Sequence, residues 1–188
     1  SQQPGSGAAW KGVMKMLLSI QQKYILEVLR KLGCVRKEQL LLMTQEKFRR
    51  SDMEITETRM DAMLRQLRTG TSSILGENGL ICLSSPQSDG LHLEAIDVML
   101  ELAEGKPEDF TTRVERPGIL RFSWGDDLHL FTVAELSAPI RPTVEALASQ
   151  KRMIWISESG VPPEGLTLPP RHFFAARLPD GSHRFYGS

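Results

Sequence analysis

Residues 56–83, TETRMDAMLRQLRTGTSSILGENGLICL, carry the strongest structural signal in the chain. Thr56 has a side chain suited to a helix N-cap, and four apolar residues then recur at helical spacing: Met60, Met63, Leu64 and Leu67. The pair Asn78-Gly79 separates two short apolar runs and is typical of a β-hairpin with a type I′ turn. This stretch therefore predicts a helix followed by a hairpin.

Two more helices are expected before this stretch. Ser19 and Gln22 have the spacing of a capping box, apolar residues from Tyr24 to Leu32 then share one helical face, and Gly33 ends that pattern. Residues 37–48 predict a second helix. The front of the chain is thus expected to run helix, helix, helix, hairpin.

The third helix has a defined outer face because its apolar stripe is well defined. At about 100° per residue, the residues opposite or beside the stripe have types that contact base edges or phosphates in a major groove. With two cations that begin the preceding helix, they are the candidate DNA-binding residues: Arg36, Lys37, Thr58, Arg59, Ala62, Arg65 and Gln66. Asp61, on the flank of this face, would repel phosphate.

The front of the chain resembles the winged-helix superfamily. The residues that carry the resemblance are Ile25-Leu26, Leu29, Gly33, Gln39-Leu40, Leu64 to Leu67 and Gly79-Leu80. The resemblance implies that the third helix reads duplex DNA and that the hairpin is the wing. Glu77 is the only charged residue at the tip of this wing, so we expect the wing not to enter a minor groove.

We predict an α+β protein with four segments: a flexible terminus at 1–18, a winged helix at 19–85, a connecting helix at 86–106, and a C-terminal α+β domain with two hairpins at 107–188. Residues 1–13 are left out of the fold prediction. The connecting helix is apolar on two sides, so it is expected either to lie between the domains or to form a homodimer. In the last segment, strands are expected around 119–136, 153–157, 173–178 and 183–186, and a short helix at 143–149.

Charge is divided unevenly although the whole chain is neutral. Residues 1–85 hold 13 lysines and arginines against 8 acidic residues, whereas residues 86–188 hold 10 against 15. A basic front half suits a nucleic-acid reader joined to an acidic module. No apolar run is long enough for a membrane span. Cys34 and Cys82 lack metal-ligand spacing and no secretory signal is visible, so we expect a cytoplasmic protein without a disulfide.

The back half offers no catalytic site that we can support. A nuclease-like domain would need an acidic pair and a lysine, but Asp127 and Glu135 are eight residues apart on a strand, about 26 Å, and no lysine follows Glu135. The His92-x-Glu94 pair lacks the cysteines of a zinc deaminase. We therefore predict no metal and no cofactor. The aromatic residues of this half are expected to form its core: Trp124, Phe131, Trp155, Phe173, Phe174, Phe185 and Tyr186.

As a whole, the chain resembles small uncharacterised bacterial mobile-element proteins, and it is distantly similar to replication-relaxation proteins, which pair a winged helix with a nuclease-like domain. The resemblance implies a non-catalytic DNA-binding regulator or accessory protein of a plasmid or mobile element. A protein-interaction scaffold whose winged helix does not bind DNA is the main alternative, and a degenerate nuclease-like domain is the second.

Overall fold

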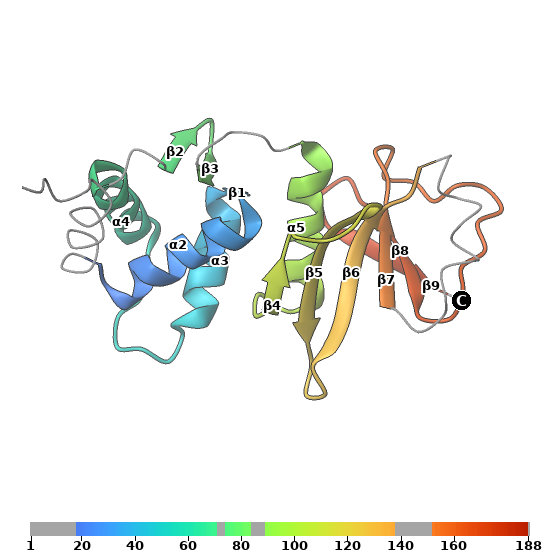
Figure 1. Cartoon of the computed structure of the whole chain (residues 1–188), viewed down its shortest axis with the longest axis horizontal. Coiled ribbons are helices and arrows are strands. Elements are labelled where there is room, and N and C mark those ends of the chain that lie inside the picture. The colour runs from blue at the N-terminus through green and yellow to red at the C-terminus, as the bar shows by residue number, and fades with distance from the viewer. Residues whose placement is uncertain (1–17, 71–73, 84–88, 138–151, 188) are drawn as a thin grey trace, which may run out of the picture. The chain divides into compact units, whose positions relative to one another are not determined.

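The computed structural model describes residues 18–70, 74–83, 89–137 and 152–187, which form an α+β protein. The chain divides into two compact units, residues 1–86 and residues 87–188, and each unit is described by itself (Figure 1). Within the described residues, no helix has the length and apolar character that crossing a membrane requires.

Three helices form most of the first unit: α2 (Ile20–Leu32), α3 (Lys37–Lys47) and α4 (Glu57–Gly70). The predicted capping box begins α2, because the Ser19 hydroxyl accepts from the Gln22 backbone N–H and the Gln22 side chain accepts from that of Ser19. The helix ends at Gly33, whose φ of +80° is favourable for glycine. Both ends of this helix thus follow from the sequence.

A small antiparallel sheet completes the first unit. It contains β1 (Cys34–Arg36), β2 (Ile74–Glu77) and β3 (Leu80–Leu83) in the order β1-β3-β2. Asn78 and Gly79 join β2 to β3 and have φ values of +53° and +77°, the two positive angles of a type I′ turn. The hairpin was predicted, whereas β1 was not, because three residues are too few to show a period.

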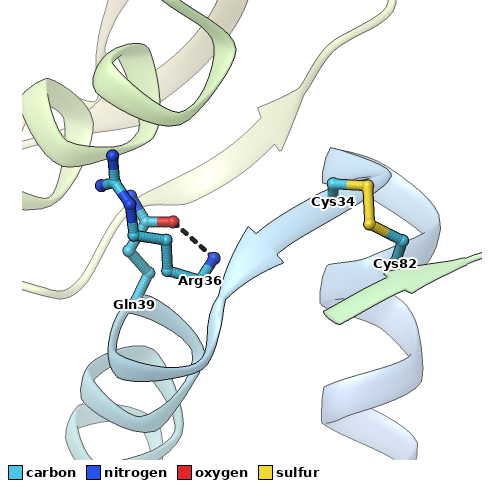
Figure 2. The surroundings of a disulfide bond; sticks show 4 residues. All are labelled: Cys34, Arg36, Gln39 and Cys82. Carbon is cyan, nitrogen blue, oxygen red and sulfur yellow. Dashed lines mark hydrogen bonds between the residues drawn. A yellow bond between two sulfur atoms is a disulfide. The ribbon is translucent and has the colours of Figure 1, made fainter. Parts of the chain in front are cut away.

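A disulfide joins Cys34 to Cys82, so the expectation of no disulfide was wrong (Figure 2). The cause is strand register. Cys34 and Cys82 lie directly opposite each other on β1 and β3, with their Cα atoms 4.1 Å apart, and both are 2% exposed. Since β1 was not predicted, this pairing could not be foreseen. The two cysteines therefore no longer argue for a reducing compartment.

The second unit is built on one six-stranded mixed sheet. Its strands are β4 (Glu108–Thr111), β5 (Gly118–Trp124), β6 (His129–Glu135), β7 (Arg152–Ile156), β8 (His172–Arg177) and β9 (His183–Gly187). They lie side by side in chain order. The pairs β6–β7 and β7–β8 are parallel and the other pairs are antiparallel, so both predicted hairpins, β5–β6 and β8–β9, are present.

Helix α5 (Gly90–Leu102) packs against β5 and β6 of the same unit. The apolar residues of both its faces are buried, including Leu91, Leu93 and Val98. The sheet core contains Phe122, Trp155 and Phe174, each fully buried. The homodimer expected through this helix stays a prediction, and the helix expected at 143–149 lies outside the described residues.

The expected aromatic core is only partly correct. Phe131, Trp155 and Phe174 are buried, but Phe185 is 36% and Tyr186 46% exposed. Both exposed residues belong to β9, which pairs with β8 alone at the edge of the sheet. Edge position explains their exposure, because among the described residues β9 has a neighbouring strand on one side alone.

Candidate nucleic-acid interface

Helix α4 holds the outward face that the sequence predicts. Thr56 begins the helix, since its hydroxyl accepts from the Arg59 backbone N–H at 3.1 Å. The predicted stripe turns inward, because Met60, Met63, Leu64 and Leu67 are all buried. On the opposite side, Thr58, Ala62, Arg65 and Gln66 are exposed. Burial of one stripe therefore fixes which side chains a duplex could reach.

Two of these candidates are tied to neighbouring segments. Gln66 accepts a hydrogen bond from the Gln22 side chain of α2 at 2.8 Å. Arg59 is partly exposed, and its guanidinium lies 3.0 Å from the Met53 sulfur. Both side chains keep exposed atoms, but these contacts already restrict their rotamers. They therefore lose less rotamer entropy on binding than an unrestrained side chain would.

Lys37 at the start of α3 lies against two carboxylates of α4. Its Nζ is 3.1 Å from Glu57 Oε1 and 3.4 Å from Asp61 Oδ1. The hydrogen bond to Glu57, followed by that to Asp61, raises the pKa of the Lys37 ammonium. The backbone N–H of Lys37 also donates to Gly79 O in the hairpin turn at 2.9 Å. This residue thus links α3, α4 and the hairpin.

Arg36, just before Lys37, ends β1, and its backbone N–H donates to Gln39 Oε1 at 2.9 Å (Figure 2). That bond satisfies one of the free donors at the start of α3. The Arg36 side chain is partly exposed. Arg36 and Lys37 therefore come to the same corner of the unit as the N-terminal half of α4.

Sequence reasoning left out Arg68, the third arginine of α4. Its guanidinium lies over Gly76 of β2, so closely that a Cβ at Gly76 would come within 1.9 Å of Arg68 Nη2. The signal that could have found it is the i, i+3 spacing from Arg65, which places both on the exposed side. The hairpin tip itself has Glu77, Asn78 and Gly79 exposed, so α4, the end of β1 and the start of α3 carry the cations of this surface.

The second unit contains a buried charged cluster that sequence reasoning also missed. Glu94 of α5 is 4% exposed, and its two carboxylate oxygens lie 2.9 Å from Arg177 Nη1 and 2.9 Å from His183 Nε2. Glu101 of α5 accepts from the other ring nitrogen of His183 and from its backbone N–H. The cluster joins α5 to the β8–β9 hairpin. The α5 residues of the cluster are more than 80 residues away from its hairpin residues in the sequence, so no local motif predicts it.

His183 is held as a cation by this arrangement. Burial alone lowers the pKa of His183, but the hydrogen bonds and charges of Glu101 and Glu94 outweigh it and raise the pKa to about 9. Since both ring nitrogens face carboxylates, each nitrogen can carry a proton that is shared with an acceptor. The geometry suits a structural ion cluster, because the side chain is only 1% exposed.

Two other histidines of this unit, His172 and His129, have different partners. Trp155 Nε1–H donates to His172 Nδ1 at 3.2 Å, and burial lowers the pKa of the fully buried His172. His129 lies near Asp127 in the β5–β6 turn. No group of three potential metal ligands occurs within residues 18–70, 74–83, 89–137 and 152–187.

An open pocket of about 380 Å³ lies between the proline-rich loop and the β8–β9 hairpin. Its lining is mainly apolar and includes Pro162, Leu166, Leu168, Phe174 and Tyr186. Leu166 and Leu168 also pack against the core of the sheet. Among the described residues, the lining offers no charged group to orient a ligand, so we assign this pocket no role.

The separation of the two acidic residues tested for nuclease chemistry agrees with the sequence argument. Asp127 lies in the turn before β6, and Glu135 is the last residue of that strand. Trp124 pairs with His129 at one end of the hairpin, whereas Gly118 pairs with Ala134 at the other.

Comparison of the chain with protein-family models, with curated proteins and with solved structures finds no match.

Proposed function

We propose that this protein is a non-catalytic DNA-binding regulator or accessory factor whose first unit is a winged helix. The proposal is supported by the element order helix, strand, helix, helix, strand, strand and by the sheet order β1-β3-β2. The observation that carries the step to DNA is the exposed face of α4, where Arg65 stands opposite the buried stripe. A helix that follows another in this arrangement is the one that reads a major groove.

The charges of this unit suit major-groove binding without wing insertion. Arg59, Arg65 and Arg68 all belong to α4. The hairpin offers a duplex no lysine or arginine among its described residues and exposes Glu77 at its tip. We therefore assign base and phosphate contacts to α4 and the start of α3, and assign the hairpin the role of holding Lys37 through Gly79. The proposed setting is a bacterial plasmid or other mobile element.

A cytoplasmic location is part of this proposal, and the disulfide constrains it. Thiols in a bacterial cytoplasm are kept reduced. The first unit must therefore fold with Cys34 and Cys82 reduced as well as bonded. Both residues are buried in the same small core, which supplies packing that does not depend on the bond.

The test is binding to duplex DNA across a salt series, with Arg65→Ala as the main variant. We expect wild-type affinity to fall linearly on a log-log plot against salt, and Arg65→Ala to weaken binding by about tenfold and flatten the slope by about one. Arg30→Ala is the matched control, since Arg30 is an exposed arginine on α2. An affinity that ignores salt, or equal losses from both variants, would refute the proposal.

A protein-interaction scaffold is the second candidate, and the acidic residues of α4 favour it. Glu57 and Asp61 lie in the helix half that would meet bases, and Glu77 lies at the hairpin tip. These carboxylates would suit a basic protein surface. Absence of duplex binding, together with a stoichiometric protein partner whose binding is lost in Asp61→Lys, would replace the first proposal with this one.

A further inference from the structure

The ion cluster of Lys37, Glu57 and Asp61 occupies the corner where α3 and α4 meet in the proposed DNA-binding unit. Lys37 is 32% exposed, while Glu57 and Asp61 are 67% and 44% exposed. One ammonium therefore faces two carboxylates, and the cluster as a whole has one excess negative charge. A phosphate that approaches this corner meets a lysine whose charge is already balanced.

The backbone makes this pairing a fixed part of the unit. Lys37 is the first residue of α3, and its N–H is bonded to Gly79 O at 2.9 Å. Glu57 and Asp61 are one turn apart on α4, so both carboxylates lie on the same side of that helix. Two helices thus present opposite charges to each other, and the long lysine side chain can turn to another partner.

We propose that Glu57 and Asp61 act as an electrostatic restraint on the proposed DNA-binding surface, holding Lys37 away from phosphate until a duplex competes for it. The inference rests on the proposed function and concerns the regulation of the same surface. Lys37 contributes to affinity only when a bound duplex brings a phosphate close enough to replace the two carboxylates. The free protein then has weaker non-specific attraction to DNA, because one cation is masked and two anions repel the backbone.

If the restraint exists, the effect of removing the two carboxylates on DNA binding depends on whether Lys37 is present. Removal of negative charge by itself predicts no such dependence. Loss of two carboxylates near DNA raises affinity through the general field whatever Lys37 does. Release of Lys37 adds a phosphate contact, and one such contact adds about 0.9 to the salt slope and about eightfold to affinity at 0.1 M salt. The added contact must disappear when Lys37 is absent.

The experiment is a double-mutant cycle measured by duplex binding across a salt series on the full chain. The four proteins are wild type, Glu57→Gln with Asp61→Asn, Lys37→Met, and the triple variant. Gln and Asn keep the size of the carboxylates, so α4 keeps its packing, and circular dichroism checks that each protein is folded. Glu27→Gln is the control, because it removes a carboxylate that pairs with a lysine, Lys31, at 3.1 Å on α2, away from the α4 face.

We expect the acidic double variant to bind about eightfold to twentyfold more tightly at 0.1 M salt, with a salt slope steeper by about 0.9. The same two changes in the Lys37→Met background should steepen the slope by less, because they act there only through the screened field. Glu27→Gln should leave both quantities near wild type. Equal slope changes in both backgrounds would overturn the restraint. If wild type still binds DNA and Arg65→Ala still weakens that binding, the proposed function stands. No binding by any variant overturns the restraint and the proposed function together.

Discussion

Cys34 and Cys82 face each other across β1 and β3 with 48 residues of chain between them. A cross-link of this length restricts the unfolded chain, so it stabilises the folded unit by about 2 to 4 kcal/mol. It connects the strand that leads into α3 with the hairpin strand that leads out of the first unit. The bond therefore acts on the unit that we propose binds DNA.

Reduction is expected to lower the stability of the first unit without unfolding it. Urea unfolding followed with and without a phosphine reductant should show a loss of about 2 to 4 kcal/mol in wild type. A variant with Cys34→Ala and Cys82→Ala should not respond to the reductant. Equal stability of oxidised and reduced wild type would contradict the bond, and complete unfolding on reduction would contradict a cytoplasmic role.

Because of His183, we expect the second unit to become less stable as pH rises into the alkaline range. Its pKa is about 9 in the folded protein and about 6.5 in an unfolded chain. Because the folded pKa is the higher one, the stabilisation is complete below pH 6.5 and is lost as pH rises through 9. We expect a loss on the order of 2 kcal/mol between pH 6.5 and pH 9.5, measured by urea unfolding.

The variant His183→Gln should remove this pH dependence while lowering stability at pH 6.5. His129→Gln is the control, because the side chain of His129, at the start of β6, is 41% exposed and lies outside the Glu94–His183–Glu101 cluster. A pH profile of His183→Gln that matches wild type would show that the Glu94–His183–Glu101 cluster is not the cause.

The β2–β3 turn needs a residue that adopts a positive φ at position 79. Gly79 has φ of +77° and no atom within 4 Å of a Cβ placed there, so a side chain would meet conformational strain without a clash. Gly79→Ala should cost about 1 to 2 kcal/mol in unfolding free energy. Gly70→Ala, in equally open space at the end of α4, should be neutral or stabilising by up to about 1 kcal/mol. Equal effects at the two glycines would contradict the turn geometry.

The elements with a clear period were predictable, and those that depend on distant pairing were not. Helix α4 and the hairpin follow from Met60, Leu67 and the Asn78-Gly79 pair, since these signals are local. Strands β1 and β4 have three and four residues, too few to show alternation. The parallel pairs β6–β7 and β7–β8 join residues separated by long connections, which no local pattern specifies.

The features of the candidate site likewise fall into those that a local pattern predicts and those that depend on packing between elements. Exposure of Thr58, Ala62 and Arg65 could be predicted, because one buried stripe defines the opposite face. The pairing of Lys37 with Glu57 and Asp61 could not, since it depends on how α3 packs beside α4. Similarly, Glu94 and His183 meet only because α5 and β9 belong to one folded unit. Charge and residue type were visible in the sequence, but their partners were not.

At the scale of the whole molecule, the two units differ in charge as well as in fold. The first unit has five more basic than acidic residues, and the second has five more acidic than basic ones. We therefore expect a duplex to be attracted to the first unit and repelled by the second. The zero net charge of the chain conceals this division, and binding to DNA should be confined to residues of the first unit.

The most direct test of this account is amide hydrogen exchange of the full chain with and without duplex DNA at low salt. We predict slower exchange in α4 and at the start of α3, no change at the β2–β3 turn, and no change in residues 89–137 and 152–187. Loss of this protection in Arg65→Ala would assign it to the α4 face. Protection confined to the second unit, or no protection at a DNA concentration that saturates binding, would contradict the account.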